Sequence, residues 1–270
     1  MICPGMWICE RIATAYFLYL AIVCWFRPVA LARRLALAGV AALVIAFVVA
    51  AAPRGPLVVR QWAPAAYILI GYYASGLVFV APSIALEAWL MAWDRRLLGD
   101  PATRFAAWPR PVLAALEIAY MGCFLLVGAG YAILSGAGRA DLADHYWTLV
   151  VSAELGSFAP LALVQTRPPW ALERKPQLAD RRIHDLASGW TEHLTIRVNT
   201  FPSGHVAGSL AAAIAVAGVM PRTGLVLLAL ALWIALATIT GRYHYVVDAI
   251  AGALLTLALW ALMVSFGFGP

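Results

Sequence analysis

Charged residues are scarce in this sequence of 270 residues. Only 12% of the residues are Asp, Glu, Lys or Arg, whereas 64% are hydrophobic. A soluble globular domain has about 25% charged residues and about 45–50% apolar residues. The composition therefore excludes an ordinary soluble domain and predicts an integral membrane protein.

Other common features are also missing. The four cysteines (Cys3, Cys9, Cys24 and Cys123) follow no metal-ligand spacing, so neither a zinc site nor a disulfide framework is indicated. The net charge is +6, but no basic tail accompanies it. We therefore expect contact with anionic lipid head groups and no binding of nucleic acid. The N-terminus lacks a basic region before its apolar stretch, so no removable signal peptide is predicted.

Long apolar runs, in contrast, are abundant. Runs of about 17–25 apolar residues are long enough to cross the hydrocarbon core of a bilayer as helices. The predicted fold class is therefore all-α, a polytopic transmembrane helical bundle. Between six and eight spans are predicted, at residues 12–26, 35–52, 65–81, 112–134, 146–164, 205–219, 223–240 and 245–266.

Two polar stretches separate these runs. Residues 83–111 mix Trp with Arg on a helical pattern that breaks at Gly99, Asp100 and Pro101. This pattern predicts either an amphipathic helix at the membrane interface or a solvated connector anchored by aromatic residues. Residues 167–200 form the longest polar stretch. Loops of this length in compact proteins are usually lids over a site or disordered segments.

The stretch FPSGHVAGS, residues 201–209, places a Pro-Ser-Gly turn directly before an apolar helix. The free N–H groups and the positive end of the helix dipole favour an anion at such a start. His205 lies in the first turn and can give a proton to a departing oxygen. A lone histidine at an interface is, however, more often structural.

His244 and Asp248 are four residues apart in RYHYVVD, residues 242–248. On one helical face, the carboxylate can orient the imidazole so that its other nitrogen acts as a nucleophile. A buried polar pair that only joins two helices is the alternative. Arg167 suits bidentate contacts with phosphate, or it serves as a snorkelling anchor. If every span crosses once, these clusters meet at one membrane face and provide what phosphoryl transfer through a phosphohistidine needs.

At these motifs, over about residues 150–255, the sequence resembles the type 2 phosphatidic acid phosphatase (PAP2) superfamily. The third motif is similar to the branch of inositol phosphorylceramide and sphingomyelin synthases. The resemblance implies a core of six transmembrane helices, with one or two additional N-terminal helices. It divides the chain into residues 1–111, which hold N-terminal transmembrane helices and the interfacial segment, and a catalytic transmembrane domain at 112–270.

The resemblance also implies a mechanism that uses no metal and no cofactor. His244 would attack phosphorus, Asp248 would orient it, and His205 would protonate the leaving group. The phosphate ligands that it implies are Arg167, Ser203 and Gly204. Thr238 stands where the family has a further arginine, and Arg242, two residues before His244, is predicted to bind phosphate in its place.

Three further positions bear on this site. Pro160 stands where the family has a lysine, and Arg174 and Lys175 are the candidate substitutes. Glu117 is predicted to lie close enough to the site to contact the residues or the head group around the phosphate. Glu154 is predicted to lie too deep to touch the phosphate, and to serve as a structural hydrogen-bonding residue or, alternatively, in a proton relay.

The leading hypothesis is a membrane phosphatase acting on a lipid phosphate or diphosphate. The alternative is a lipid phosphotransferase that moves a phospho-head group to an alcohol, similar to inositol phosphorylceramide synthase. A transporter with a buried polar relay is a third hypothesis, and a divalent metal on the two histidines and the aspartate is a further alternative. The resemblance implies a bacterial plasma membrane with the site facing outward, whereas the arginines of the short loops favour a cytoplasmic site.

Overall fold

The computed structural model describes residues 5–173, 195–196 and 198–268. Within these ranges the regular structure is helical, apart from an isolated antiparallel bridge between Thr166 and Asn199. The predicted all-α helical bundle is therefore confirmed. The α-helices are α1 (Ile8–Val23), α2 (Leu31–Ala46), α3 (Leu57–Gly76), α4 (Ile84–Leu98), α5 (Pro101–Ala106), α6 (Arg110–Gly136), α7 (Ala143–Phe158), α9 (Gly204–Ala217), α10 (Pro221–Thr240) and α11 (Val246–Ser265).

Each predicted span corresponds to one of these helices, namely α1, α2, α3, α6, α7, α9, α10 and α11. Among the described residues, five segments are both long and apolar enough to cross a membrane. They are Ile8–Phe26, Leu31–Ala50, Arg110–Gly136, Pro221–Thr240 and Val246–Ser265. The shorter α9 is also apolar.

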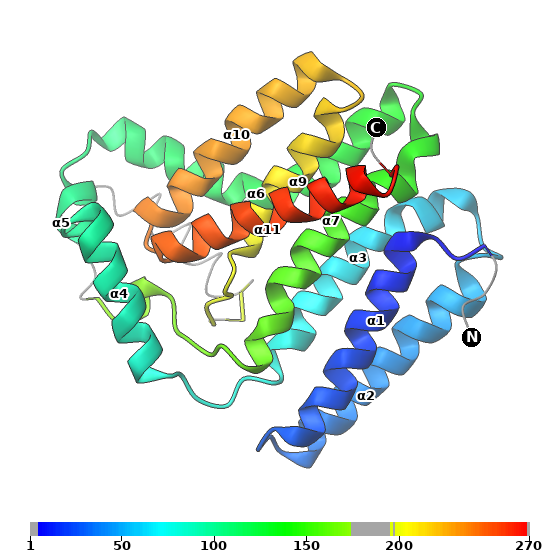
Figure 1. Ribbon diagram of the computed structural model, residues 1–270, viewed down its shortest axis with the longest axis horizontal. Helices are drawn as coiled ribbons and strands as arrows, with labels where there is room; N and C mark the ends of the chain where they lie inside the picture. The colour runs from blue at the N-terminus through cyan, green and yellow to red at the C-terminus, as the bar shows by residue number, and fades with distance from the viewer. Residues whose placement is uncertain (1–4, 174–194, 197, 269–270) are drawn as a thin grey trace.

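Helix α9 lies at the centre of the bundle. It packs against α6, α7, α10 and α11, and Figure 1 shows it in yellow among them. Small residues permit the close approach of these helices. A Cβ atom on Gly252 of α11 would lie only 2.6 Å from the carbonyl oxygen of Ser203, at the start of α9. The beginnings of α9 and α11 therefore meet at the same end of the bundle.

The two N-terminal helices lie beside this central group. Helix α1 packs against α2, α3 and α7, and Figure 1 shows α1 and α2 in blue along one edge. The Asp144 carboxylate of α7 accepts hydrogen bonds from the Ile8 and Cys9 N–H groups, at 3.0 and 3.1 Å. A carboxylate at the N-terminus of a helix is stabilised by the helix dipole. This contact ties α1 to the central helices.

Helices α4 and α5 occupy the segment predicted to be interfacial or solvated. The chain breaks between them at the predicted place, since α4 ends at Gly99 with a φ of 76° and α5 begins at Pro101. Helix α4 packs on α11, and its buried face carries Glu87, Leu90 and Asp94. The interpretation as a solvated connector is therefore wrong for this face, because both acidic side chains are turned into the protein.

Candidate active site

Two histidines meet where α9 and α11 begin. His205 lies in the first turn of α9, and His244 lies in the loop between α10 and α11. The Nδ1 atom of His205 is 3.1 Å from Nε2 of His244. On the other side of the same ring, His244 Nδ1 is 3.4 Å from Asp248 Oδ2. The structure thus places the three predicted catalytic residues in a row.

The local fold of RYHYVVD differs from the predicted continuous helix. Tyr245 is the N-cap of α11 and has an extended backbone, so His244 lies just before the helix. Asp248 is at the third helical position, where its Oδ2 atom accepts a hydrogen bond from the Tyr245 N–H at 3.0 Å. Asp248 therefore reaches back to the histidine from the first turn. This capping contact fixes the carboxylate that faces the ring.

His244 is a buried side chain, only 3% exposed. Burial disfavours the charged imidazolium and lowers the pKa of His244 to about 3. Burial therefore favours the neutral ring over the imidazolium. A neutral imidazole that donates through Nδ1 to a carboxylate keeps a lone pair on Nε2, which is the form that a nucleophile requires.

The start of α9 is held by Ser203. Its Oγ atom accepts a hydrogen bond from the Val206 N–H at 3.4 Å, and its own N–H donates to the Asp248 carbonyl at 3.0 Å. Ser203 is fully buried, and Gly204 is buried beside Phe158. In this structure Ser203 therefore serves as a helix cap. The predicted role of Ser203 and Gly204 as phosphate ligands stays a prediction.

Arg167 lies beside the site and is paired with α4. Its Nε and Nη2 atoms donate to the two carboxylate oxygens of Glu87, at 3.0 and 2.8 Å. Hydrogen bonds from Arg167 hold the pKa of the Glu87 carboxyl below its ordinary value. The Arg167 carbonyl accepts a hydrogen bond from the Tyr245 hydroxyl at 3.0 Å. The backbone of Arg167 is thus joined to the loop that carries His244.

Arg242 is more deeply buried and has two acidic partners. Its Nε and Nη2 atoms donate to Glu173, at 2.9 and 2.7 Å, and its Nη1 atom is 2.8 Å from Oδ2 of Asp94. Asp94 also accepts a hydrogen bond from the Val246 N–H at the start of α11. Arg242 therefore joins α4, the segment around residue 173 and the loop before α11. Its predicted contact with phosphate stays a prediction.

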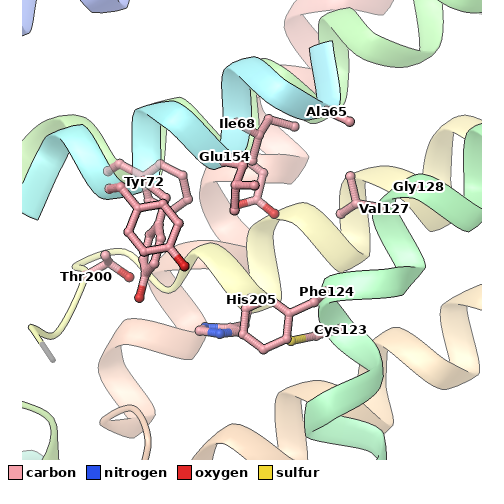
Figure 2. A pocket seen from close by; sticks show the side chains of 13 residues that line it. Ala65, Ile68, Tyr72, Cys123, Phe124, Val127, Gly128, Glu154, Thr200 and His205 are labelled. Carbon is pink, nitrogen blue, oxygen red and sulfur yellow. The ribbon is translucent and has the colours of Figure 1, made fainter. Parts of the chain in front are cut away.

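Two adjoining cavities reach the histidine pair. The smaller, of about 30 Å³, is lined by both His205 and His244. The larger, of about 400 Å³, extends between α3, α6, α7 and α9, and His205 lines it as well (Figure 2). The two cavities share Tyr72, Thr200 and His205 in their walls. Among the described residues, no arginine lines either cavity.

Aromatic side chains support the histidine pair. The rings of Tyr120 and Tyr243 stack at 3.8 Å, and the Tyr120 ring is 5.1 Å from that of His205. The Tyr243 hydroxyl donates a hydrogen bond to Glu117 at 2.7 Å. Glu117, which the sequence placed near the site, is therefore connected to His205 through two tyrosines.

Sequence reasoning missed the acidic partners of the arginines. Glu87 and Asp94 are seven residues apart with Leu90 between them, a spacing that places all three on one helical face. This spacing was the available signal that both carboxyl groups are buried. Glu173 lies in the polar stretch and had no comparable signal. The candidate lysine substitutes, Arg174 and Lys175, lie outside the described residues.

Glu154 lies nearer to His205 than its distance along the chain from Arg167 indicated, and the prediction that it does not touch the phosphate stays a prediction. The prediction measured its distance from Arg167 along one helix, but α9 begins beside Glu154. A Cβ atom on Gly204 would lie 3.2 Å from Oε2 of Glu154. Glu154 and His205 consequently line the same cavity (Figure 2).

Comparison with protein families matches residues 88–262 to the PAP2 superfamily. The chain belongs to the PAP2 superfamily. The matched region begins in α4 and includes the histidine pair and Asp248. No curated protein and no solved structure matches the chain. Membership in the PAP2 superfamily, together with the long apolar helices, supports an integral membrane protein with phosphatase-type or phosphotransferase-type activity.

The alternative of a divalent metal on the two histidines and Asp248 finds no geometric support. In the described part of the chain, no group of three His, Cys, Asp or Glu side chains is arranged to hold a metal ion. The ring nitrogens of His205 and His244 face each other, and Asp248 lies beyond the second ring. The three side chains thus form a line and do not converge on one point.

Proposed function

We propose that this PAP2 protein hydrolyses a lipid phosphate or diphosphate at the membrane through a phosphohistidine on His244. The observation that carries the proposal is the row formed by Asp248, His244 and His205 at the wall of a cavity. The row contains an orienting carboxylate, a neutral nucleophile and a proton donor in the order that the reaction uses them. The family supports this class of chemistry.

The reaction begins with attack of His244 Nε2 on phosphorus. Asp248 holds the Nδ1–H, so the Nε2 lone pair forms the N–P bond while the bond from phosphorus to the lipid oxygen breaks. His205, protonated beside the bound phosphate dianion, donates its proton to that oxygen and becomes a neutral imidazole, and the lipid leaves as an alcohol, or as a monophosphate from a diphosphate. His205 then takes a proton from water as the water oxygen attacks phosphorus. Inorganic phosphate leaves, and His244 is regenerated.

The contact between the two imidazoles explains how the phosphate would be placed. In-line transfer needs the nucleophile and the leaving oxygen on opposite sides of phosphorus. His205 Nδ1 and His244 Nε2 now face each other at 3.1 Å. An entering phosphoryl group would separate these nitrogens and take their hydrogen bonds. His205 would then lie on the side of the leaving oxygen.

The first test is release of inorganic phosphate by the purified protein in detergent from a panel of lipid phosphates and diphosphates. Because His244, His205 and Asp248 provide the nucleophile, the acid and the orienting group, we expect the rate in EDTA to stay within about twofold of the untreated rate. A rate that falls in EDTA and returns with a divalent cation would contradict the proposed mechanism. Release only when an alcohol is added, with the lipid product attached to it, would favour the phosphotransferase.

A second prediction concerns the pair between Arg167 and Glu87. The Arg167 side chain is 42% exposed and can turn toward a phosphate, but Glu87 competes for the same donors. We expect Glu87→Gln to lower KM for a lipid phosphate about threefold, because it removes the competing charge. Arg167→Ala should raise KM. If Glu87→Gln changes only the unfolding temperature and leaves KM as it was, Arg167 is an anchor and no phosphate ligand.

A further inference from the structure

Among the described residues, the mainly apolar wall of the larger cavity contains one acidic group. Its walls include Ile68, Leu69, Phe124 and Val127, and Glu154 projects into it from α7 (Figure 2). A volume of about 400 Å³ is sufficient for a small-molecule ligand or for part of a lipid. A mainly apolar cavity with a few polar side chains is typical of ligand sites in which those polar groups select the ligand.

The Glu154 carboxyl has no partner among the described residues. The side chain is only 8% exposed, and its carboxyl oxygens, at the wall of the cavity, make no hydrogen bond or ion pair within that part of the chain. A buried polar group without a partner destabilises the fold, so its presence calls for a function. Acidic residues among transmembrane helices are functional by default.

The fold makes room for this carboxyl group beside the catalytic helix. Gly204 and Gly208 are one turn apart on α9, and both face Glu154. A Cβ atom on Gly208 would overlap the carboxyl group, so only glycine at this position leaves the side chain where it is. His205, which follows Gly204, lies in the same turn. The carboxyl group is therefore held next to the proton donor of the proposed reaction.

The position of the cavity fixes which part of a substrate it can receive. It shares Tyr72, Thr200 and His205 with the smaller cavity, where His205 and His244 face each other. A ligand with phosphorus between the histidines thus has its leaving oxygen at His205. The atoms that follow this oxygen would enter the larger cavity, and Glu154 is the acidic side chain they meet there.

We propose that the larger cavity binds the lipid portion of the substrate, and that Glu154 accepts a hydrogen bond from a hydroxyl or ammonium group a few bonds from the phosphate ester. This inference rests on the proposed function. The favoured class is lipid monophosphates with such a donor, for example a lysophospholipid with a free hydroxyl or a long-chain amino alcohol phosphate. Isoprenoid phosphates and diacylglycerol phosphates have no donor at that place.

The test compares a donor-bearing lipid with an analogue that lacks this donor alone, and adds a lipid whose donor is an ammonium group. The probes are 1-oleoyl lysophosphatidate, its 2-deoxy analogue and sphinganine 1-phosphate. We expect kcat/KM of the wild-type protein to be about tenfold higher for a donor-bearing lipid than for the deoxy analogue, the effect of one hydrogen bond. Glu154→Leu should remove this preference by slowing only the donor-bearing lipids. Glu154→Gln keeps an acceptor and should retain most of the preference.

A binding measurement separates this inference from the proposed function. Dissociation constants of the same lipids are measured on His244→Ala, alone and combined with Glu154→Leu. A preference for donor-bearing lipids that disappears in the double variant supports the site. It does so even if the wild-type protein releases no phosphate, a result that would overturn only the proposed hydrolysis. Phosphate release from all the lipids at equal kcat/KM, with equal dissociation constants, overturns the inference and leaves the proposed function standing.

Discussion

Replacing His244 with alanine is expected to reduce the release of phosphate from a lipid phosphate by at least about a thousandfold. The reason is that the proposed route runs through an N–P bond that alanine cannot form. Steady-state release measures the loss. The wild-type protein, quenched during turnover with a labelled substrate, should also carry phosphate that is labile to acid and stable to alkali, and His244→Ala should carry none.

Two other histidine variants control this experiment. His145 lies at the start of α7, where its ring stacks on Phe268 at 5.3 Å, so His145→Ala should keep the wild-type rate within about twofold. His205→Ala should be slow with an alkyl phosphate but should still form the phosphoenzyme from an aryl phosphate, whose leaving group needs no proton. Full activity in His244→Ala would show that another group attacks phosphorus.

The membrane helices could be predicted from the sequence because their signal is local. A run of apolar residues long enough to cross the bilayer favours a helix, because a helix satisfies all the backbone hydrogen bonds within the segment. The break between α4 and α5 was equally local, because it depends on Gly99 and Pro101. Predicting these features does not require knowing which other segments of the chain pack against them.

The surroundings of the histidines could be predicted only in part. The residue types and order of the motifs indicated that His205 and His244 belong together. The direction of the arginine side chains depends on Glu87, Asp94 and Glu173, which come from remote parts of the chain. The position of Glu154 depends on where α9 begins relative to α7. Contacts between distant segments leave no periodic pattern in the sequence. The direction of the arginine side chains and the position of Glu154 could therefore not be predicted from it.

The ion pairs of Arg242 are expected to dominate the stability of this end of the bundle. Its side chain is 3% exposed, and Arg242→Ala would leave the buried Asp94 and the partly buried Glu173, 13% exposed, without their cation. Breaking a buried ion pair by removing one partner costs about 3–5 kcal/mol. We expect a loss of this size in the free energy of unfolding, measured with denaturant in detergent. Arg139→Ala removes an exposed pair with Asp141 and should cost less than about 1 kcal/mol.

Removing the acidic partners together with Arg242 decides between its two roles. Asp94→Asn and Glu173→Gln, combined with Arg242→Ala, leave no uncompensated charge in the cluster, so much of the lost stability should return. If Arg242 only positions the loop that carries His244, the phosphatase activity should return with the stability. If Arg242 also holds the phosphate, the triple variant should be stable and still have a raised KM, because the carboxylates no longer oppose folding but the cation for the substrate is gone.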